Sequence, residues 1–149
     1  MSFDFYMPVQ IFSGEYAVEK HASALALGKH ALIVTGRRSA IASGALADVT
    51  AVLQAQGIGY TLFDKITENP LASPCREGGA LCREVGADFV IGIGGGSPMD
   101  AAKAIALMTA NPQEDEGALY TAKPLSHLPV VCIPTTCGTG SEVTPYAIL

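Results

Sequence analysis

The stretch "GGGSPMDAAKAIA", residues 94–106, decides the fold of this chain. Three glycines, a serine and a proline stand directly before a run of good helix formers. Glycine lets the backbone turn sharply and approach a ligand without a Cβ in the way. Ser97 is a good N-cap, Pro98 suits the first helical position, and Asp100 is spaced to reach back as a capping-box partner. We therefore predict a turn followed by a helix over residues 98–110.

A helix that begins behind such a turn presents exposed N–H groups and a favourable dipole to a phosphate. An ordinary strand-to-helix turn with a good cap accounts for the stretch equally well, so both interpretations stay open. The stretch "GIGGGS", residues 92–97, is not the G-x-G-x-x-G dinucleotide fingerprint, because Ser97 stands where the last glycine would be. It also follows a later strand of the chain rather than the first.

Outward from this turn, strand-like and helix-like segments alternate. "HALIVTG", residues 30–36, is a short apolar run typical of a strand buried on both faces. Further strands are predicted at 60–66, 87–93 and 129–134, and further helices at 43–56 and 73–85, although Gly78 and Gly79 weaken the second helix. This alternation predicts an α/β fold with a doubly wound, mostly parallel, Rossmann-like sheet. Residues 111–129 are predicted to form a loop.

Composition excludes several classes of protein. The chain has 149 residues, enough for one domain, and a net charge of -5 gives no basic surface for nucleic acid or a membrane. No apolar run reaches the roughly 18 residues of a membrane span, and residues 1–12 lack the features of a signal peptide. The cysteines form no C-x-x-C pair, which favours reduced thiols and a cytoplasmic protein; they are Cys75, Cys82, Cys132 and Cys137.

A second motif follows the last predicted strand. "IPTTCGTGSEVT", residues 133–144, offers the hydroxyls of Thr135, Thr136 and Thr139 interleaved with two glycines. Hydroxyls and flexible backbone at the carboxyl end of a parallel strand suit the ribose and phosphates of a nucleotide. The alternative is a serine- and threonine-rich turn that caps a following helix through Ser141 or Thr139.

Together the two motifs resemble the iron-containing alcohol dehydrogenases, the group III enzymes with a dehydroquinate synthase-like fold. "GGGSPMDAAKAIA" and "PTTCGTGSEVT" match the two amino-terminal motifs of that family almost residue for residue. "ALIVTG", "ENP" and "ADFVIGIGGGS" occur in the expected order, so the resemblance covers essentially the whole chain.

The resemblance implies that residues 1–149 form an amino-terminal NAD(P)-binding domain of a longer two-domain protein. The implied partners are a nicotinamide dinucleotide and a small alcohol or aldehyde, between which hydride is transferred. The residues implied in cofactor binding are Gly94, Gly95, Gly96, Ser97, Pro98, Asn69, Thr135, Thr136, Thr139, Thr144 and Tyr146. Asn69 is placed beside the adenosine half, and Thr144 and Tyr146 near the nicotinamide. Asp100 and Lys103 have either a structural role, as a helix-surface pair, or a catalytic one.

No catalytic or metal-binding residue is expected in this chain. In the family an aspartate and three histidines of a helical second domain, absent here, bind Fe²⁺ or another divalent metal. His21, His30 and His127 share no ligand spacing and are interpreted as surface or strand-edge residues, and Cys137 as a small residue rather than a nucleophile. "YAIL", residues 146–149, is a strand-like run that suggests a cut within a longer protein. We therefore expect the isolated chain to be inactive, and the longer protein to be a homo-oligomer.

The cofactor preference is predicted from the residues after the first strand. Where the family often has an acidic residue, this chain has Gly36, followed by Arg37 and Arg38. Two guanidinium groups in place of a carboxylate favour a phosphate, so NADP is expected to be accepted at least as well as NAD; alternatively both arginines simply face solvent. Two other functions stay open: a maleylacetate reductase-like enzyme of the same fold, and a nucleotide-binding module without catalysis.

Overall fold

The computed structural model describes residues 8–121 and 124–149. Two predictions fall partly outside these ranges. Residues 1–7 belong to the stretch 1–12 for which no signal peptide is predicted, and residues 122–123 belong to the predicted loop. The strands are β1 (His30–Gly36), β2 (Gly59–Ile66), β3 (Phe89–Gly94) and β4 (Val130–Pro134). The α-helices are α1 (Ala17–Lys20), α2 (Ser39–Ala42), α3 (Ala45–Ala55), α4 (Ala72–Glu84) and α5 (Gly96–Ala110). Short 3₁₀ helices are η1 (Ala22–Leu25), η2 (Glu116–Tyr120) and η3 (Ser141–Val143).

The four strands form one parallel sheet in the order β2-β1-β3-β4. The chain passes from β1 to β2 on one side and then returns to place β3 on the other side of β1. The predicted α/β fold with a parallel sheet is therefore confirmed. All four strands end at the same edge of the sheet, where Gly36 is in register with Ile66 and Gly94 with Pro134. We call this edge, with the loops that leave it, the carboxyl edge.

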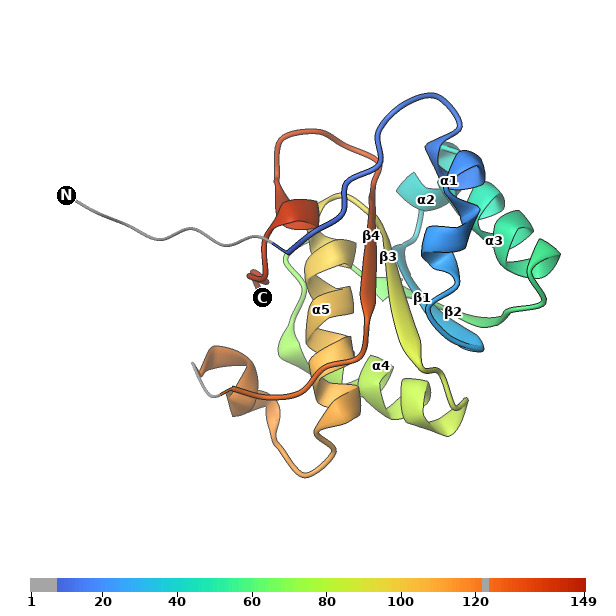
Figure 1. Ribbon diagram of the computed structural model, residues 1–149. Coiled ribbons are helices and arrows are strands. Elements are labelled where there is room, and N and C mark those ends of the chain that lie inside the picture. Colours follow the sequence, from blue (N-terminus) through green and yellow to red (C-terminus); the bar gives the residue numbers. More distant parts are fainter. Residues whose placement is uncertain (1–7, 122–123) are drawn as a thin grey trace.

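Helices cover both faces of the sheet, as the alternation of side chains along the strands requires. Leu32 and Val34 point toward α4 and α5, whereas Ala31 and Ile33 point toward α2 and α3. Figure 1 shows the sheet between these two groups of helices, with α5 alongside β3 and β4. The strands β1 and β3 are buried on both faces, which explains why their sequences are continuous apolar runs.

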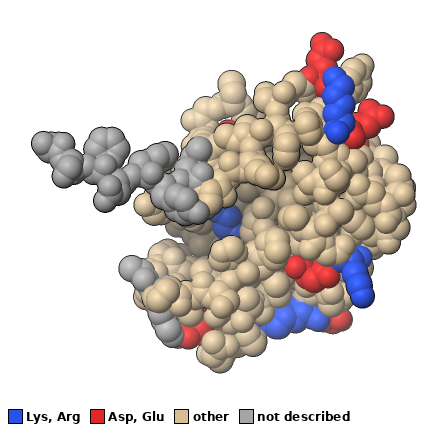
Figure 2. All heavy atoms as spheres, in the orientation of Figure 1, with Lys and Arg blue, Asp and Glu red and all other residues tan. Residues whose placement is uncertain are grey.

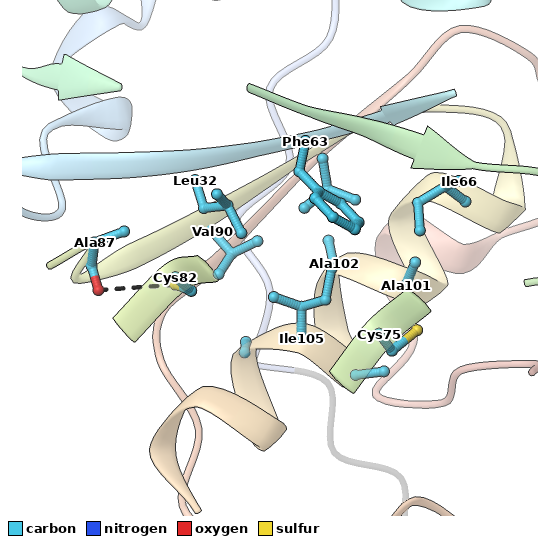
Figure 3. Packing of buried hydrophobic residues seen from close by; sticks show 13 residues of the cluster. Leu32, Phe63, Ile66, Cys75, Cys82, Ala87, Val90, Ala101, Ala102 and Ile105 are labelled. Carbon is cyan, nitrogen blue, oxygen red and sulfur yellow. Dashed lines mark hydrogen bonds between the residues drawn. The ribbon is translucent and has the colours of Figure 1, made fainter. Parts of the chain in front are cut away.

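Glycines allow the helices of one face to pack closely. A methyl group on Gly92 would lie 2.8 Å from Ala102 Cβ and 3.0 Å from Met99 Cα, so α5 sits directly on β3. Gly78 in α4 is likewise close to Ile105 of α5. Figure 3 shows the resulting core, in which Phe63, Val90 and Ala102 meet between the sheet and the helices. Gly78 and Gly79, which weakened the prediction of a helix, therefore allow α4 to pack closely against α5.

Several predicted boundaries are wrong. Helix α5 begins at Gly96, with Gly95 as N-cap, so Ser97 is not the cap and Pro98 is not the first helical residue. The reason is that Gly94 (φ 149°) makes the turn before the serine is reached. The helix predicted over 43–56 is confirmed as α3 (Ala45–Ala55), which begins after Gly44 (φ 81°), whereas the short α2 (Ser39–Ala42) before it was not predicted.

The two least regular stretches also differ from expectation. The loop predicted over 111–129 contains η2 (Glu116–Tyr120), which begins where the Asp115 side chain accepts a hydrogen bond from the Gly117 amide at 2.8 Å. Residues 146–149, predicted as strand-like, have no regular secondary structure, although Leu149 packs against the core on the α5 side of the sheet.

The cysteines and histidines fill structural positions. All four cysteines are free: Cys75 and Cys82 are buried in α4, Cys132 is half-buried in β4, and Cys137 is exposed in the loop after β4. His30 begins β1, where its ring is 2.9 Å from Thr61 Oγ1, and His21 stacks on Phe12. Figure 2 shows a face on which charged side chains are few and scattered. No helix in the described part of the chain has the length and hydropathy needed to cross a membrane.

Candidate nucleotide site

The carboxyl edge brings the two sequence motifs together. The amide of Thr135 donates a hydrogen bond to the carbonyl of Gly94 at 2.8 Å, which joins the start of the threonine loop (residues 135–140) to the glycine turn (residues 94–96). A methyl group on Gly95 would lie 3.3 Å from Thr136 Oγ1, and one on Gly96 would lie 3.2 Å from Thr139 Cγ2. Motifs about forty residues apart in the chain are therefore in van der Waals contact.

The glycine turn leaves the first turn of α5 without a side-chain cap. Gly95, the N-cap, has no side chain with which to occupy the helix amides, and it adopts an extended conformation. Gly95, Gly96 and Ser97 are half-buried, while Pro98 is buried. The 15-residue helix behind them directs the positive end of its dipole at this point. Uncapped backbone amides at the positive end of a helix dipole, beside the threonine loop, are suited to an anion.

The threonine loop contributes the polar side of the site. Thr136 and Thr139 are exposed, whereas Thr135 is half-buried and its Oγ1 is buried without a hydrogen-bond partner among the described residues. Thr139 Oγ1 accepts a hydrogen bond from the Ser141 amide at 3.3 Å, and Gly140 (φ 66°) precedes η3. The alternative of a capping turn is therefore partly correct, since Thr139 does hold the start of η3. It does not account for Thr135 or Thr136.

The segment after β1 completes the same edge. A methyl group on Gly36 would lie 3.8 Å from Pro98 Cγ, and the Ser39 hydroxyl lies beside Gly94. Arg37 and Arg38 are exposed and have no ion-pair partner in residues 8–121 and 124–149. Ser39 was not predicted as a site residue. The sequence feature that could have indicated it is a serine at the start of a helix soon after a buried strand.

Three predicted residues lie farther from the glycine turn. Asn69 is exposed in the loop after β2 and has a left-handed backbone (φ 52°). Thr144 and Tyr146 have exposed side chains beyond η3. The structure gives none of these three a contact with the glycines, so their assignment stays a prediction.

Asp100 and Lys103 do form a pair, one of the two alternatives left open, but it is not a helix-surface pair. Both side chains are largely buried, and their carboxylate oxygen and ammonium nitrogen are 3.4 Å apart. Asp100 does not reach back to cap α5 either. Its Oδ1 accepts a hydrogen bond from Ser141 Oγ at 2.6 Å, because the early start of the helix turns this residue inward toward η3.

No group of three or more potential metal ligands occurs among the residues described here. The residues that do converge are backbone amides, hydroxyl groups and, at the margin, two arginines. That set matches an anionic, hydroxyl-bearing ligand such as a nucleotide. These residues also lie at the topological switch point between β1 and β3, where the strand order changes direction across the sheet. Ligands usually bind at this point in such folds.

Comparisons with known proteins agree with this description. The family model for "Iron-containing alcohol dehydrogenase" matches residues 8–149. Long-chain primary alcohol dehydrogenase AdhA of Thermoanaerobacter ethanolicus is 40% identical over 119 residues, which are 78% of this chain and 30% of AdhA. The chain therefore spans about a third of the length of this relative.

Solved structures show the same relationship. An iron-containing alcohol dehydrogenase from Thermotoga maritima superposes with a TM-score of 0.93 at 45% identity, over 99% of this chain and 42% of that one. Sulfoacetaldehyde reductase from Bifidobacterium kashiwanohense, in complex with NAD⁺, gives 0.76 at 30% identity, over 97% and 39%. From the two motifs, the parallel sheet and these matches, we conclude that the chain belongs to the iron-containing alcohol dehydrogenase family.

Proposed function

We propose that this chain is the dinucleotide-binding domain of an iron-dependent alcohol dehydrogenase, and that its carboxyl edge binds the cofactor. The contact between the glycine turn and the threonine loop is the observation that carries the proposal. It brings the start of α5, whose N-cap has no side chain, against the side chains of Thr136 and Thr139, at the topological switch point of a parallel sheet. The sulfoacetaldehyde reductase that superposes on the chain is itself described as bound to NAD⁺.

The residues present fit a pyrophosphate. A Cβ on Gly95 would lie 3.3 Å from Thr136 Oγ1 and one on Gly96 3.2 Å from Thr139 Cγ2, so both positions favour glycine where the threonine loop meets the helix start. The buried Thr135 Oγ1 has no protein partner among the described residues, and a ligand oxygen would satisfy it. We assign the pyrophosphate to Gly95, Gly96 and Ser97, and the adjoining phosphate or ribose oxygens to Thr135, Thr136 and Thr139.

The chain's own residues bind and orient the cofactor. A bound nicotinamide dinucleotide would supply hydride-transfer chemistry for an alcohol or aldehyde, and a divalent metal would supply polarisation of the substrate oxygen. We place the metal ligands in a second domain, and Thr144 and Tyr146 beside the nicotinamide. Asn69 is assigned to the adenosine half. The domain thus supplies position and orientation rather than the reacting groups.

The residues after β1 support NADP as an accepted cofactor. Gly36 offers no carboxylate to repel a 2′-phosphate, and the exposed guanidinium groups of Arg37 and Arg38 have no acidic partner in the described chain. A charge-assisted hydrogen bond contributes about 1.5–3 kcal/mol, enough to offset a modest preference for NAD.

Titration of the 149-residue chain with NAD and NADP at low salt tests both assignments. We expect both dinucleotides to bind, and NADP at least as tightly as NAD. The variant R37S/R38S is expected to weaken NADP about tenfold and NAD little. R76S is the control, because Arg76 forms an exposed ion pair with Glu116 elsewhere on the surface. Binding of neither dinucleotide contradicts the proposed function, and NAD binding about tenfold tighter than NADP contradicts the cofactor preference.

Activity provides a second test. With iron added, we expect no alcohol dehydrogenase turnover from the 149-residue chain and turnover from a protein that includes the second domain. Turnover by the 149-residue chain alone would refute the division of roles.

A further inference from the structure

A buried cluster on the second turn of α5 ties the threonine loop to the helix. It consists of Asp100, Lys103 and Ser141, together with the carbonyl of Tyr146, and we call it the clamp. Lys103 Nζ donates to Ser141 O at 2.7 Å, to Ser141 Oγ at 2.8 Å and to Tyr146 O at 2.7 Å. Ser141 Oγ in turn donates to Asp100 Oδ1 at 2.6 Å.

The hydrogen-bond donors of the clamp are used completely. An ammonium group has three N–H bonds, and Lys103 directs them at three loop oxygens. The Ser141 hydroxyl accepts from Lys103 and gives its own proton to Asp100. The Lys103 side chain is 14% exposed and that of Asp100 10% exposed, so these are polar groups that must be paired.

The clamp is connected to the cofactor site by a continuous series of contacts. The Ser141 amide donates to Thr139 Oγ1 at 3.3 Å, and the Thr139 side chain lies against Gly96 in the first turn of α5. Lys103 therefore fixes Ser141, Ser141 fixes Thr139, and Thr139 packs against the glycine turn. The hydrogen bond from Lys103 Nζ to Tyr146 O holds the segment after η3, which carries Thr144 and Tyr146.

We propose that Lys103 is a positioning residue for cofactor binding: it holds residues 135–146 in the conformation that the dinucleotide requires. This inference rests on the proposed function, and it assigns to Lys103 no contact with the cofactor. Preorganisation is the physical basis, since a loop already held in its binding conformation loses less entropy when the ligand arrives.

The test compares K103M with K65M in the 149-residue chain. Methionine keeps much of the lysine stem but has no ammonium group, and Lys65 is the matched control because it forms an exposed salt bridge with Glu77 on β2 and α4. Two quantities are measured: the dissociation constant for NAD or NADP, and hydrogen exchange of the amides in residues 135–146. Thermal unfolding establishes a temperature at which both variants are folded.

We expect K103M to raise the dissociation constant about tenfold and to speed exchange in residues 135–146, while exchange in α3 stays unchanged. K65M is expected to change neither quantity. K103R keeps the charge and the donors, and is expected to recover part of the affinity, which a general loss of packing would not allow. S141A removes one acceptor of the clamp and is expected to give a smaller effect of the same kind.

Unchanged affinity and unchanged loop exchange in K103M would overturn the inference and leave the proposed function standing. Absence of dinucleotide binding by the unmodified chain would instead refute the proposed function. If K103M does not fold, S141A decides: unchanged affinity and exchange in that variant overturn the inference, and weaker binding with faster loop exchange supports it.

Discussion

The α-carbon of Gly96 faces the side chain of Thr139, so that a methyl group on the glycine would lie 3.2 Å from Thr139 Cγ2. Gly96 opens helix α5, and Thr139 belongs to the loop after β4. The contact joins the two motifs that distinguish this sequence, and it is possible because glycine has no side chain at that point.

A larger residue at this contact is expected to remove nucleotide binding. G96V directs two methyl groups at Thr139, whose side chain is exposed and lies outside the hydrophobic core. We therefore expect a change of less than about 1 kcal/mol in the free energy of unfolding, but a dissociation constant for the dinucleotide raised by about tenfold or more. A55V, at the exposed end of α3, introduces the same valine side chain away from the site. Equal affinities for G96V and A55V would contradict the assignment of the turn.

The packing of α5 on β3 predicts a different outcome for Gly92. A methyl group there would lie 3.0 Å from Met99 Cα and 3.1 Å from Pro98 O, and backbone atoms cannot move aside as a flexible side chain can. We expect G92A to lower the free energy of unfolding by about 1–3 kcal/mol, measured by urea denaturation. A stability equal to that of the unmodified chain would show that α5 does not rest on β3 as described.

Asp88 predicts a pH-dependent stability. Burial raises the pKa of its carboxyl, but hydrogen bonds from the amides of Lys29 and His30 outweigh this, and the net pKa is lowered. A lowered pKa in the folded state means that the contribution is present above the unfolded pKa and is lost as pH falls through the folded one.

We therefore expect D88N to be less stable than the unmodified chain at neutral pH, and the difference to shrink on acidification through and below the ordinary range for aspartate. Urea unfolding across that range measures it, with D64N, at an exposed position of β2, as control. A difference between D88N and the unmodified chain that is constant with pH would disprove the role of the carboxylate charge.

The cysteines predict a simple pattern of chemical labelling. Burial raises the pKa of the Cys75 thiol to about 12 and that of Cys132 to about 11, and it raises the pKa of Cys82 as well. Cys137 is exposed between Thr136 and Thr139. At about pH 8 we expect a thiol reagent to label Cys137 first in the folded chain, and bound dinucleotide to protect it. Rapid labelling of Cys75, or no protection of Cys137, would contradict the account; C137S identifies the labelled residue.

The sequence predicted the parts of the fold that depend on local patterns. Continuous apolar runs predicted β1 and β3, and the glycines before a helix-forming run predicted the turn into α5. The exact start of α5 could not be predicted, because the residue type of Ser97 favours an N-cap there but does not show which glycine makes the turn. In the structure Gly94 makes the turn, and Gly96 is therefore the first helical residue.

The clamp could not be predicted for a different reason. Asp100 and Ser141 are 41 residues apart, and their hydrogen bond exists because helix α5, buried around much of its surface, brings the carboxylate against η3. Local spacing suggested only a pairing of Asp100 with Ser97 or Lys103. The proximity of Gly96 to Thr139 was foreseeable in outline, since parallel strands end at one edge, but the contact itself depends on how the loop after β4 folds back.

The proposed function requires that a nicotinamide dinucleotide binds at the carboxyl edge, beside the glycine turn and the threonine loop. Amide chemical shifts of the ¹⁵N-labelled 149-residue chain, recorded during titration with NAD and with NADP, test it most directly. The account predicts saturable shifts at Gly95, Gly96 and Ser97 and at residues 135–139, with little change near Asp88 at the opposite edge of the sheet. Saturable binding that leaves the glycine turn and the threonine loop unshifted, or no binding of either dinucleotide, would contradict it.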